Sequence, residues 1–127
     1  MSLRSPLGRV LGHGAARDGV SHWWMQRVTA VALVPLTLWF AFSLLSLPTF
    51  DYSTVRSWLG EGWSPVLAVL LLLVLAVHSS LGVQVVVEDY VHARGAKMAT
   101  LLGSTFLHAV AAAAGVFAIL KIAFAGA

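Results

Sequence analysis

The chain has 127 residues, enough for one compact unit, and 59% of them are hydrophobic while 10% are charged. Because a soluble domain carries roughly a quarter charged residues, this composition excludes a soluble domain and predicts a membrane protein. The lack of cysteine excludes disulfides, thiolate metal sites, iron–sulfur ligation and cysteine nucleophiles within the chain, and the net charge of +3 from scattered basic residues gives no support to nucleic-acid binding.

Residues 1–23 form an N-terminal arm that bears arginines and almost no acidic residues. Targeting peptides share this pattern, but the arm lacks an apolar signal core and runs directly into the first apolar helix. We therefore interpret it as a cytoplasmic arm of the mature protein. The first transmembrane helix is predicted over residues 24–47, with residues 29–47 uncharged and Pro35 inside, where a kink is tolerated if neighbouring groups satisfy the freed carbonyl.

Two further transmembrane helices are predicted over residues 65–87 and 98–120, and the uncharged part of the latter is residues 99–120. Each apolar run is long enough to cross a hydrocarbon core about 30 Å thick as a helix. The connecting segments, residues 48–64 and 88–97, are short and polar. The sequence therefore predicts an all-α integral membrane protein in which residues 1–127 form a single domain with three transmembrane helices.

The basic residues predict the orientation in the membrane. Six of them precede the first span or lie in the second connection, and two fall on the opposite side. Because positively charged segments stay in the cytoplasm, the N-terminus and the second connection are expected there, or in the matrix for a mitochondrial source. The six are Arg4, Arg9, Arg17, Arg27, Arg94 and Lys97, and the two are Arg56 and Lys121.

Polar side chains inside the second and third spans are His78, Gln84 and His108. An ionisable group at membrane depth is a functional candidate, and the alternative is an interhelical hydrogen bond of about 1 kcal/mol. His78 falls close to the bilayer middle, and the helical period places Gly82 and Asp89 on the same face. Neutral imidazole is a standard axial ligand of haem iron, and Gly82 would leave room for a bulky planar group beside it.

His108 is expected at nearly the same depth on the neighbouring span, so a site with two histidine ligands within the chain is geometrically possible. Its surroundings favour another interpretation. Small residues such as Ala111 and Gly115 recur at four-residue spacing, which lets helix backbones approach closely. We therefore interpret His108 as mainly structural.

A second group of polar residues is expected at the cytoplasmic boundary. Asp89 and Tyr90 end the second span, and Arg27 near the start of the first span is expected in the same layer. Trp23 and Trp24 are interpreted as interfacial anchors, a role that is also open to Tyr90. Arg27 either extends to lipid headgroups or neutralises a buried carboxylate, and the sequence leaves both alternatives open.

The stretches HSSLGVQVVVEDYVH (78–92) and HWWMQRVTAVALVPLTLWF (22–40) resemble the hydrophobic membrane anchor subunit, the D-type chain, of succinate dehydrogenase in its alphaproteobacterial and mitochondrial forms. The His or Ser that usually precedes the arginine in that family is shared here between Ser21 and His22. The resemblance implies a three-helix membrane-anchor domain that packs as half of a helical bundle with a C-type cytochrome b anchor subunit. It also implies an iron–sulfur subunit, a flavoprotein subunit and membrane lipid as partners, in the bacterial inner membrane in preference to the mitochondrial one.

The same resemblance assigns roles to individual residues. His78 is implied as an axial ligand of the iron of haem b, whose other ligand comes from the partner anchor chain, with Gly82 beside the haem and Arg27 near a propionate. Tyr90 is implied as the hydrogen-bond donor to a ubiquinone carbonyl. Asp89 is implied as part of the same quinone site, where it could relay protons.

The resulting interpretation is a membrane subunit of succinate:quinone oxidoreductase that carries no catalytic residues of its own for succinate oxidation. It attaches the other subunits to the membrane, contributes a haem b ligand and forms part of the ubiquinone site. One alternative is a structural or assembly subunit that binds no cofactor. A small transporter is disfavoured, because few polar residues are available to line a path through the membrane.

Overall fold

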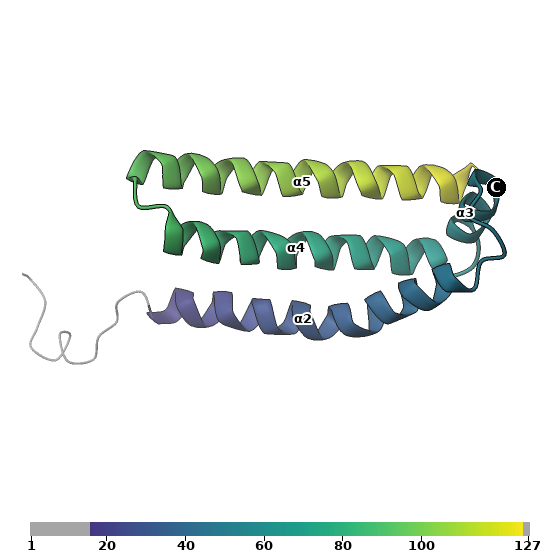
Figure 1. Ribbon diagram of the computed structural model, residues 1–127, viewed down its shortest axis with the longest axis horizontal. Coiled ribbons are helices and arrows are strands. Elements are labelled where there is room, and N and C mark those ends of the chain that lie inside the picture. The colour runs from purple at the N-terminus through teal and green to yellow at the C-terminus, as the bar shows by residue number, and fades with distance from the viewer. Residues whose placement is uncertain (1–15, 126–127) are drawn as a thin grey trace, which may run out of the picture.

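The computed structural model describes residues 16–125, and these residues are almost entirely helical (Figure 1). The prediction of an all-α fold is confirmed. The helices are α2 (Ala16–Leu45), α3 (Tyr52–Gly60), α4 (Ser64–Tyr90) and α5 (Arg94–Phe124). Three segments are long and apolar enough to cross a membrane, namely Gly19–Leu45, Ser64–Tyr90 and Arg94–Phe124, as the sequence predicts.

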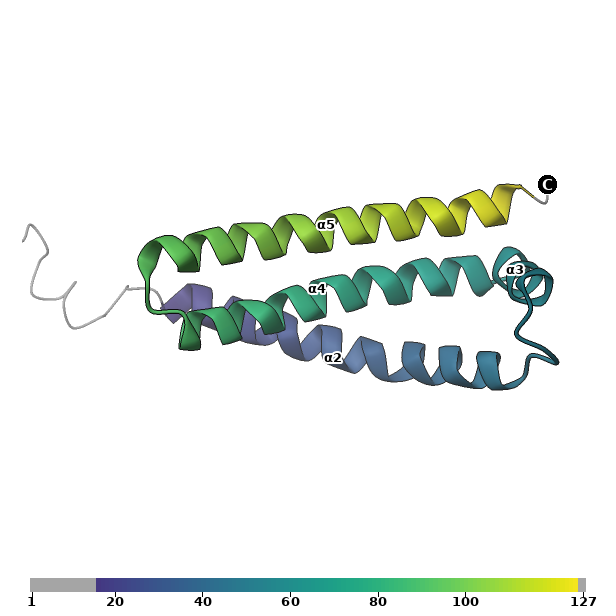
Figure 2. The same ribbon diagram turned by 45° about the horizontal axis from the view of Figure 1, so that its top comes forward.

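The three long helices form an open layer with α4 in the middle (Figures 1 and 2). Helix α4 packs against both α2 and α5, whereas α2 and α5 do not pack against each other within residues 16–125. Helix α3 lies across one end of the layer, where it contacts α4 and the end of α5. Each outer helix therefore keeps a full side without a helix against it.

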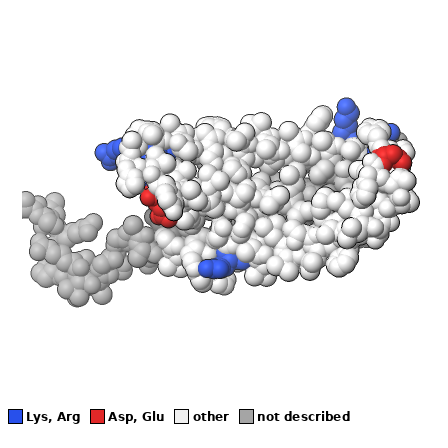
Figure 3. Space-filling model, viewed as in Figure 1, with Lys and Arg blue, Asp and Glu red and all other residues white. Residues whose placement is uncertain are grey.

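Very few side chains are buried by the chain itself. Among the described residues, the buried apolar side chains are Leu36, Ala68 and Val87, and the buried polar one is Thr29. Large apolar side chains remain exposed along all three long helices. Most charged side chains lie toward the two ends of the layer, but one basic side chain lies over α2, away from both ends (Figure 3). This surface fits a chain covered by lipid and by other membrane helices.

All three long helices begin before their predicted spans. Helix α2 starts at Ala16, inside the predicted 1–23 arm, while residues 1–15 of that arm lie outside the described part of the chain. Helix α4 runs on to Tyr90 and α5 begins at Arg94. Counting uncharged residues underestimates a helix, because polar turns at the membrane boundary satisfy the backbone just as well. Helix α2 also continues through Pro35 and bends in its second half (Figure 1).

The connection over residues 48–64 contains a short helix, α3, which was not predicted from the sequence. Asp51 caps the helix by accepting a hydrogen bond from the Thr54 backbone N–H at 2.8 Å. Hydrogen bonds from the Thr49 and Ser53 hydroxyls join this one, and together they hold the pKa of Asp51 well below its usual range. Trp58 anchors the other face by stacking on Trp39, with 6.0 Å between ring centroids.

Candidate functional site

His78 lies midway along α4 and contacts α2 through both of its ring nitrogens. Its Nδ1 atom is 2.9 Å from the hydroxyl oxygen of Thr29, and its Nε2 atom is 3.4 Å from the side-chain nitrogen of Gln26. Thr29 is only 7% exposed. The imidazole is therefore held in a fixed position at the interface of α2 and α4, at the place where the sequence predicts a functional histidine.

Thr29 and Gln26 belong to a stripe on α2 that also includes His22. Spacings of three and four residues place all of them on one face of the helix. Together with His78 they form what we call the α2–α4 polar cluster: His22, Gln26, Thr29 and His78. Gly82 lies beside it, since a Cβ atom at that glycine would sit 3.8 Å from the Gln26 side-chain nitrogen.

The cluster contains two buried polar atoms that lack a hydrogen-bond partner among the described residues. They are Nε2 of His22 and Oε1 of Gln26. Unpaired buried polar atoms are rare in folded proteins, and each costs about 1–3 kcal/mol. The Gln26 side chain lies next to Nε2 of His78, and His22 lies one turn earlier on α2. The Thr29 hydroxyl therefore has its hydrogen-bond partners, whereas Gln26 and His22 each keep one polar atom without a partner among the described residues.

The expectation that Arg27 shares a layer with Asp89 and Tyr90 is wrong. Arg27 lies between two residues that contact His78, and His78 precedes Tyr90 by twelve residues, or roughly 18 Å along α4. Arg27 is therefore level with the polar cluster. Its guanidinium lies over the ring of Trp23, 5.5 Å from the ring centroid, and its side chain is exposed on the outside of α2.

Asp89 and Tyr90 occupy the last turn of α4, and both side chains are exposed. The Tyr90 side chain is 77% exposed. The beginning of α2 and the end of α4 lie at the same end of the layer (Figure 1). These two predicted quinone-site residues are thus separate from the polar cluster and accessible to a neighbouring subunit or to lipid.

The other two intramembrane polar residues stay within their own helices. Gln84 donates from its side-chain nitrogen to a carboxylate oxygen of Glu88, one turn further along α4, at 2.8 Å. His108 Nδ1 is 2.7 Å from the backbone carbonyl of Ser104, one turn earlier on α5. No hydrogen bond joins His108 to His78 in residues 16–125, and no group of three or more His, Asp or Glu side chains there is placed to hold a metal ion.

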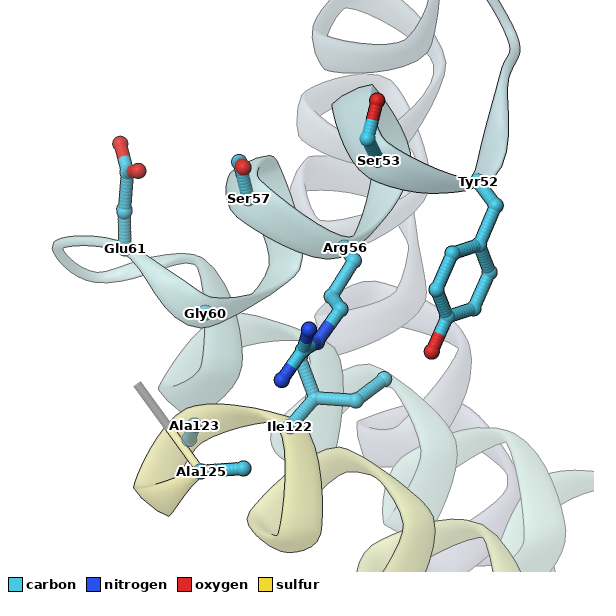
Figure 4. Close-up of a pocket in the computed structure, with 9 residues that line it drawn as sticks. All are labelled: Tyr52, Ser53, Arg56, Ser57, Gly60, Glu61, Ile122, Ala123 and Ala125. Carbon is cyan, nitrogen blue, oxygen red and sulfur yellow. The ribbon is translucent and has the colours of Figure 1, made fainter. Parts of the chain in front are cut away.

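A separate hollow of about 480 Å³ lies between α3 and the end of α5, at the end of the layer opposite to Asp89 and Tyr90. Figure 4 shows the Arg56 side chain extending from α3 toward Ile122, while Glu61 points away. None of the residues predicted as a functional site lines this hollow. It is distinct from the polar cluster and from the boundary pair Asp89 and Tyr90.

Sequence reasoning missed Thr29 and Gln26 as partners of His78, and gave His22 no separate role. A signal was present in the sequence. Polar residues at positions 22, 26 and 29 recur at helical spacing on a segment that is otherwise apolar, which marks a polar face. What the spacing alone lacks is the register between α2 and α4, which determines whether this face meets His78 or lipid.

Comparison with known proteins gives one consistent result. The family model described as succinate dehydrogenase/fumarate reductase transmembrane subunit matches residues 1–120. A succinate dehydrogenase hydrophobic membrane anchor subunit of Rickettsia conorii is 33% identical over 90 residues, which cover 70% of this chain and 71% of the relative. The subunit of the same name from Paracoccus denitrificans is 29% identical over 114 residues, covering 90% and 88%. No solved structure is significantly similar.

Proposed function

The chain belongs to the succinate dehydrogenase/fumarate reductase transmembrane subunit family, and on this premise we propose that it anchors a succinate:quinone oxidoreductase in the bacterial inner membrane. The match over residues 1–120 is the observation that carries the proposal. The flavoprotein and iron–sulfur subunits would sit on the cytoplasmic side, and succinate oxidation would take place in them. This chain would attach that soluble pair to the membrane and frame the sites where its electrons leave.

A C-type cytochrome b anchor subunit is the proposed membrane partner. Its support is the open layer of three helices, in which the outer sides of α2 and α5 have no helix against them within residues 16–125. Apolar side chains on these sides are well exposed, for example Val31 at 71% and Phe117 at 70%. A second set of helices packed against this layer would complete a bundle, with lipid covering what remains.

We propose His78 as an axial ligand of haem b, with the second ligand from the partner anchor chain. The residues present fit the group: one imidazole is fixed at mid-membrane depth, a glycine lies one turn away, and two adjacent buried atoms lack partners. Haem b, when bound, would accept and pass on single electrons. Gln26 would have to turn away from His78 Nε2, which its long 3.4 Å contact allows at little cost.

Arg27 would then neutralise a haem propionate. Its support is its depth, because the residues on either side of it belong to or adjoin the polar cluster around His78. Its guanidinium points to the outside of α2, where the partner chain is expected, and an arginine at membrane depth is costly without an anion. The alternative of an arginine that reaches only headgroups is disfavoured by the same depth.

We propose that Tyr90 and Asp89 form part of the ubiquinone site. Reduction of a quinone to a quinol takes up two protons with two electrons, so the site needs a hydrogen-bond donor and access to water. The exposed Tyr90 hydroxyl at the end of α4 meets both requirements, and Asp89 beside it could relay protons. Exposure in the single chain leaves both side chains available to a site completed by other subunits.

Purification of the complex through a tag on this chain tests the proposal. The complex should contain flavin and iron–sulfur clusters, reduce ubiquinone with succinate and give a haem b signal in a reduced-minus-oxidised spectrum. An active complex without haem b would favour the alternative of a structural subunit that binds no cofactor. A preparation without flavin would contradict the anchor function itself.

The proposed orientation places the N-terminus and the connection between α4 and α5 in the cytoplasm. Cysteines introduced at Ser53 and Ala96 should then react with an impermeant thiol reagent from opposite sides of the membrane. Because the chain has no native cysteine, each label reports one site. Labelling of both positions from the same side would contradict a three-span arrangement.

A further inference from the structure

The hydroxyl group of Thr29 has three close neighbours. Its oxygen lies 2.8 Å from the Met25 carbonyl, 3.2 Å from the Gln26 carbonyl and 2.9 Å from His78 Nδ1. A threonine hydroxyl carries one proton and can also accept hydrogen bonds, whereas a carbonyl oxygen can only accept. The hydroxyl proton must therefore point toward the carbonyls of α2, since their oxygens would otherwise face an oxygen lone pair.

With its proton committed to α2, the Thr29 oxygen can only accept from His78. The Nδ1 atom must then carry the ring proton, and a neutral imidazole with a proton on Nδ1 keeps an unprotonated Nε2. The second contact of the ring agrees. The side-chain nitrogen of Gln26 lies 3.4 Å from Nε2 and, as an amide donor, is compatible with an unprotonated Nε2.

We propose that Thr29 is a positioning residue that sets the tautomer and orientation of His78, so that Nε2 is the nitrogen offered to the haem iron. The inference rests on the proposed function of His78 as a haem ligand. A histidine that donates its other N–H to an oxygen is a stronger and better oriented metal ligand. Thr29 is only 7% exposed, so its hydroxyl is largely shielded from solvent.

The first test uses the complete complex and three substitutions. Thr29→Val keeps the shape and removes the hydroxyl, Thr29→Ser keeps the hydroxyl, and Thr37→Val is the matched control. Thr37 makes the same hydrogen bonds to its own helix, at 2.7 Å and 3.2 Å, but no hydrogen bond to a histidine among the described residues. Thr29→Val should raise the haem reduction potential and lower haem affinity about 10–100-fold, read as a lower haem-to-flavin ratio. The other two variants should match the parent.

A haem potential in Thr29→Val equal to that of the parent would overturn the inference. His78→Leu, measured in parallel, separates this failure from that of the proposed function. If His78→Leu loses haem b while Thr29→Val keeps the parent potential, only the role of Thr29 is wrong. If His78→Leu keeps haem b unchanged, the haem ligand assignment is wrong and the role of Thr29 falls with it.

A second measurement needs no haem and no stable variant complex. The full chain, labelled with ¹⁵N-histidine and reconstituted in lipid, gives ring nitrogen shifts that identify the protonated nitrogen, and comparison with His78→Gln assigns the His78 signals. We expect the Nδ1–H form for His78, and the Nε2–H form in part of the molecules of Thr29→Val. A His78 ring that is protonated at Nε2 in the unmodified chain would overturn the inference.

Discussion

The two faces of α4 differ in how they hold a neighbouring helix. On the α2 side, His78 reaches across the interface to a buried hydroxyl and a carboxamide. On the α5 side the close contact at Gly115 is apolar, since a Cβ atom there would lie 2.5 Å from Leu72 Cδ2. Each side has a histidine near mid-membrane, but His108 bonds only to its own helix. Intramembrane histidines are therefore distinguished by what the facing helix offers them, and the depth of the residue alone does not separate them.

The strongest test of this comparison replaces each of the two histidines separately by leucine. His78→Leu should remove nearly all haem b from the complex, because it deletes an imidazole that the facing helix α2 orients. His108→Leu should leave the haem b spectrum unchanged, since its ring is tied to the Ser104 carbonyl. Haem content is measured by reduced-minus-oxidised spectra relative to flavin. Loss of haem b in both variants would instead favour the alternative in which His78 and His108 of this chain are both haem ligands.

Tyr90 extends the comparison from the middle of α4 to its end. Tyr90→Phe removes a hydroxyl proposed to donate to a quinone carbonyl, which should cost about 1–3 kcal/mol, or roughly five- to a hundred-fold in quinone-linked turnover. Succinate oxidation with an artificial acceptor and the haem content should not change. Tyr52→Phe is the control, because Tyr52 is equally exposed, 78% against 77%, at the other end of the layer. Equal quinone turnover in parent and Tyr90→Phe would leave Tyr90 as an interfacial anchor.

The parts of the fold that depend only on neighbouring residues in the sequence were predictable. Three apolar runs of sufficient length need no tertiary information to be identified as spans. Helix α3 was not predictable in this way, since it is short, mixed in composition and dependent on a cap at Asp51 and on stacking of Trp58 against α2. A connection of this kind becomes helical only when its amphipathic side has a surface to pack on.

The candidate site was predictable along each helix and unpredictable between helices. The helical period predicts Gly82 on the same face of α4 as His78, and both residues lie near the Gln26 side-chain nitrogen. Thr29 and Gln26 were missed and Arg27 was placed too close to the boundary for one common reason. All three depend on the register of α2 against α4. An uncharged run that begins at residue 29 suggests that Arg27 lies at the membrane boundary, whereas the hydrogen bond between Thr29 and His78 places this part of α2 beside the middle of α4.

The apolar face of α4 can be tested by filling its closest contact. Gly115→Leu would drive a large side chain into Leu72, which should destabilise the α4–α5 interface by about 1–3 kcal/mol without altering the haem b spectrum. Gly103→Leu is the matched control on the same helix, because nothing lies within 4 Å of a Cβ atom there. Unfolding of the complex in detergent titrations gives the measurement. A shift of the same size for both glycines would mean that the close approach at Gly115 adds nothing specific.

The smallest expected effect lies outside the membrane, at the cap of α3. Because hydrogen bonds lower the pKa of Asp51 in the folded chain, its carboxylate stabilises α3 fully above the unfolded pKa of about 3.9, and this contribution declines as pH falls below that value. Hydrogen exchange of the Thr54 amide, which donates to Asp51, should therefore become faster, relative to the intrinsic rate, in acid. Asp51→Asn keeps an acceptor at the cap and should abolish the pH dependence of Thr54 amide exchange, whereas Asp51→Ala should show fast exchange of this amide at every pH.

Because α3 packs on α4 and α5 and stacks on Trp39 of α2, but makes no hydrogen bond to His78, neither substitution at Asp51 should change the haem b spectrum. A haem change in Asp51→Ala would show that the two ends of α4 are coupled, and the contrast between its polar and apolar faces would then be incomplete.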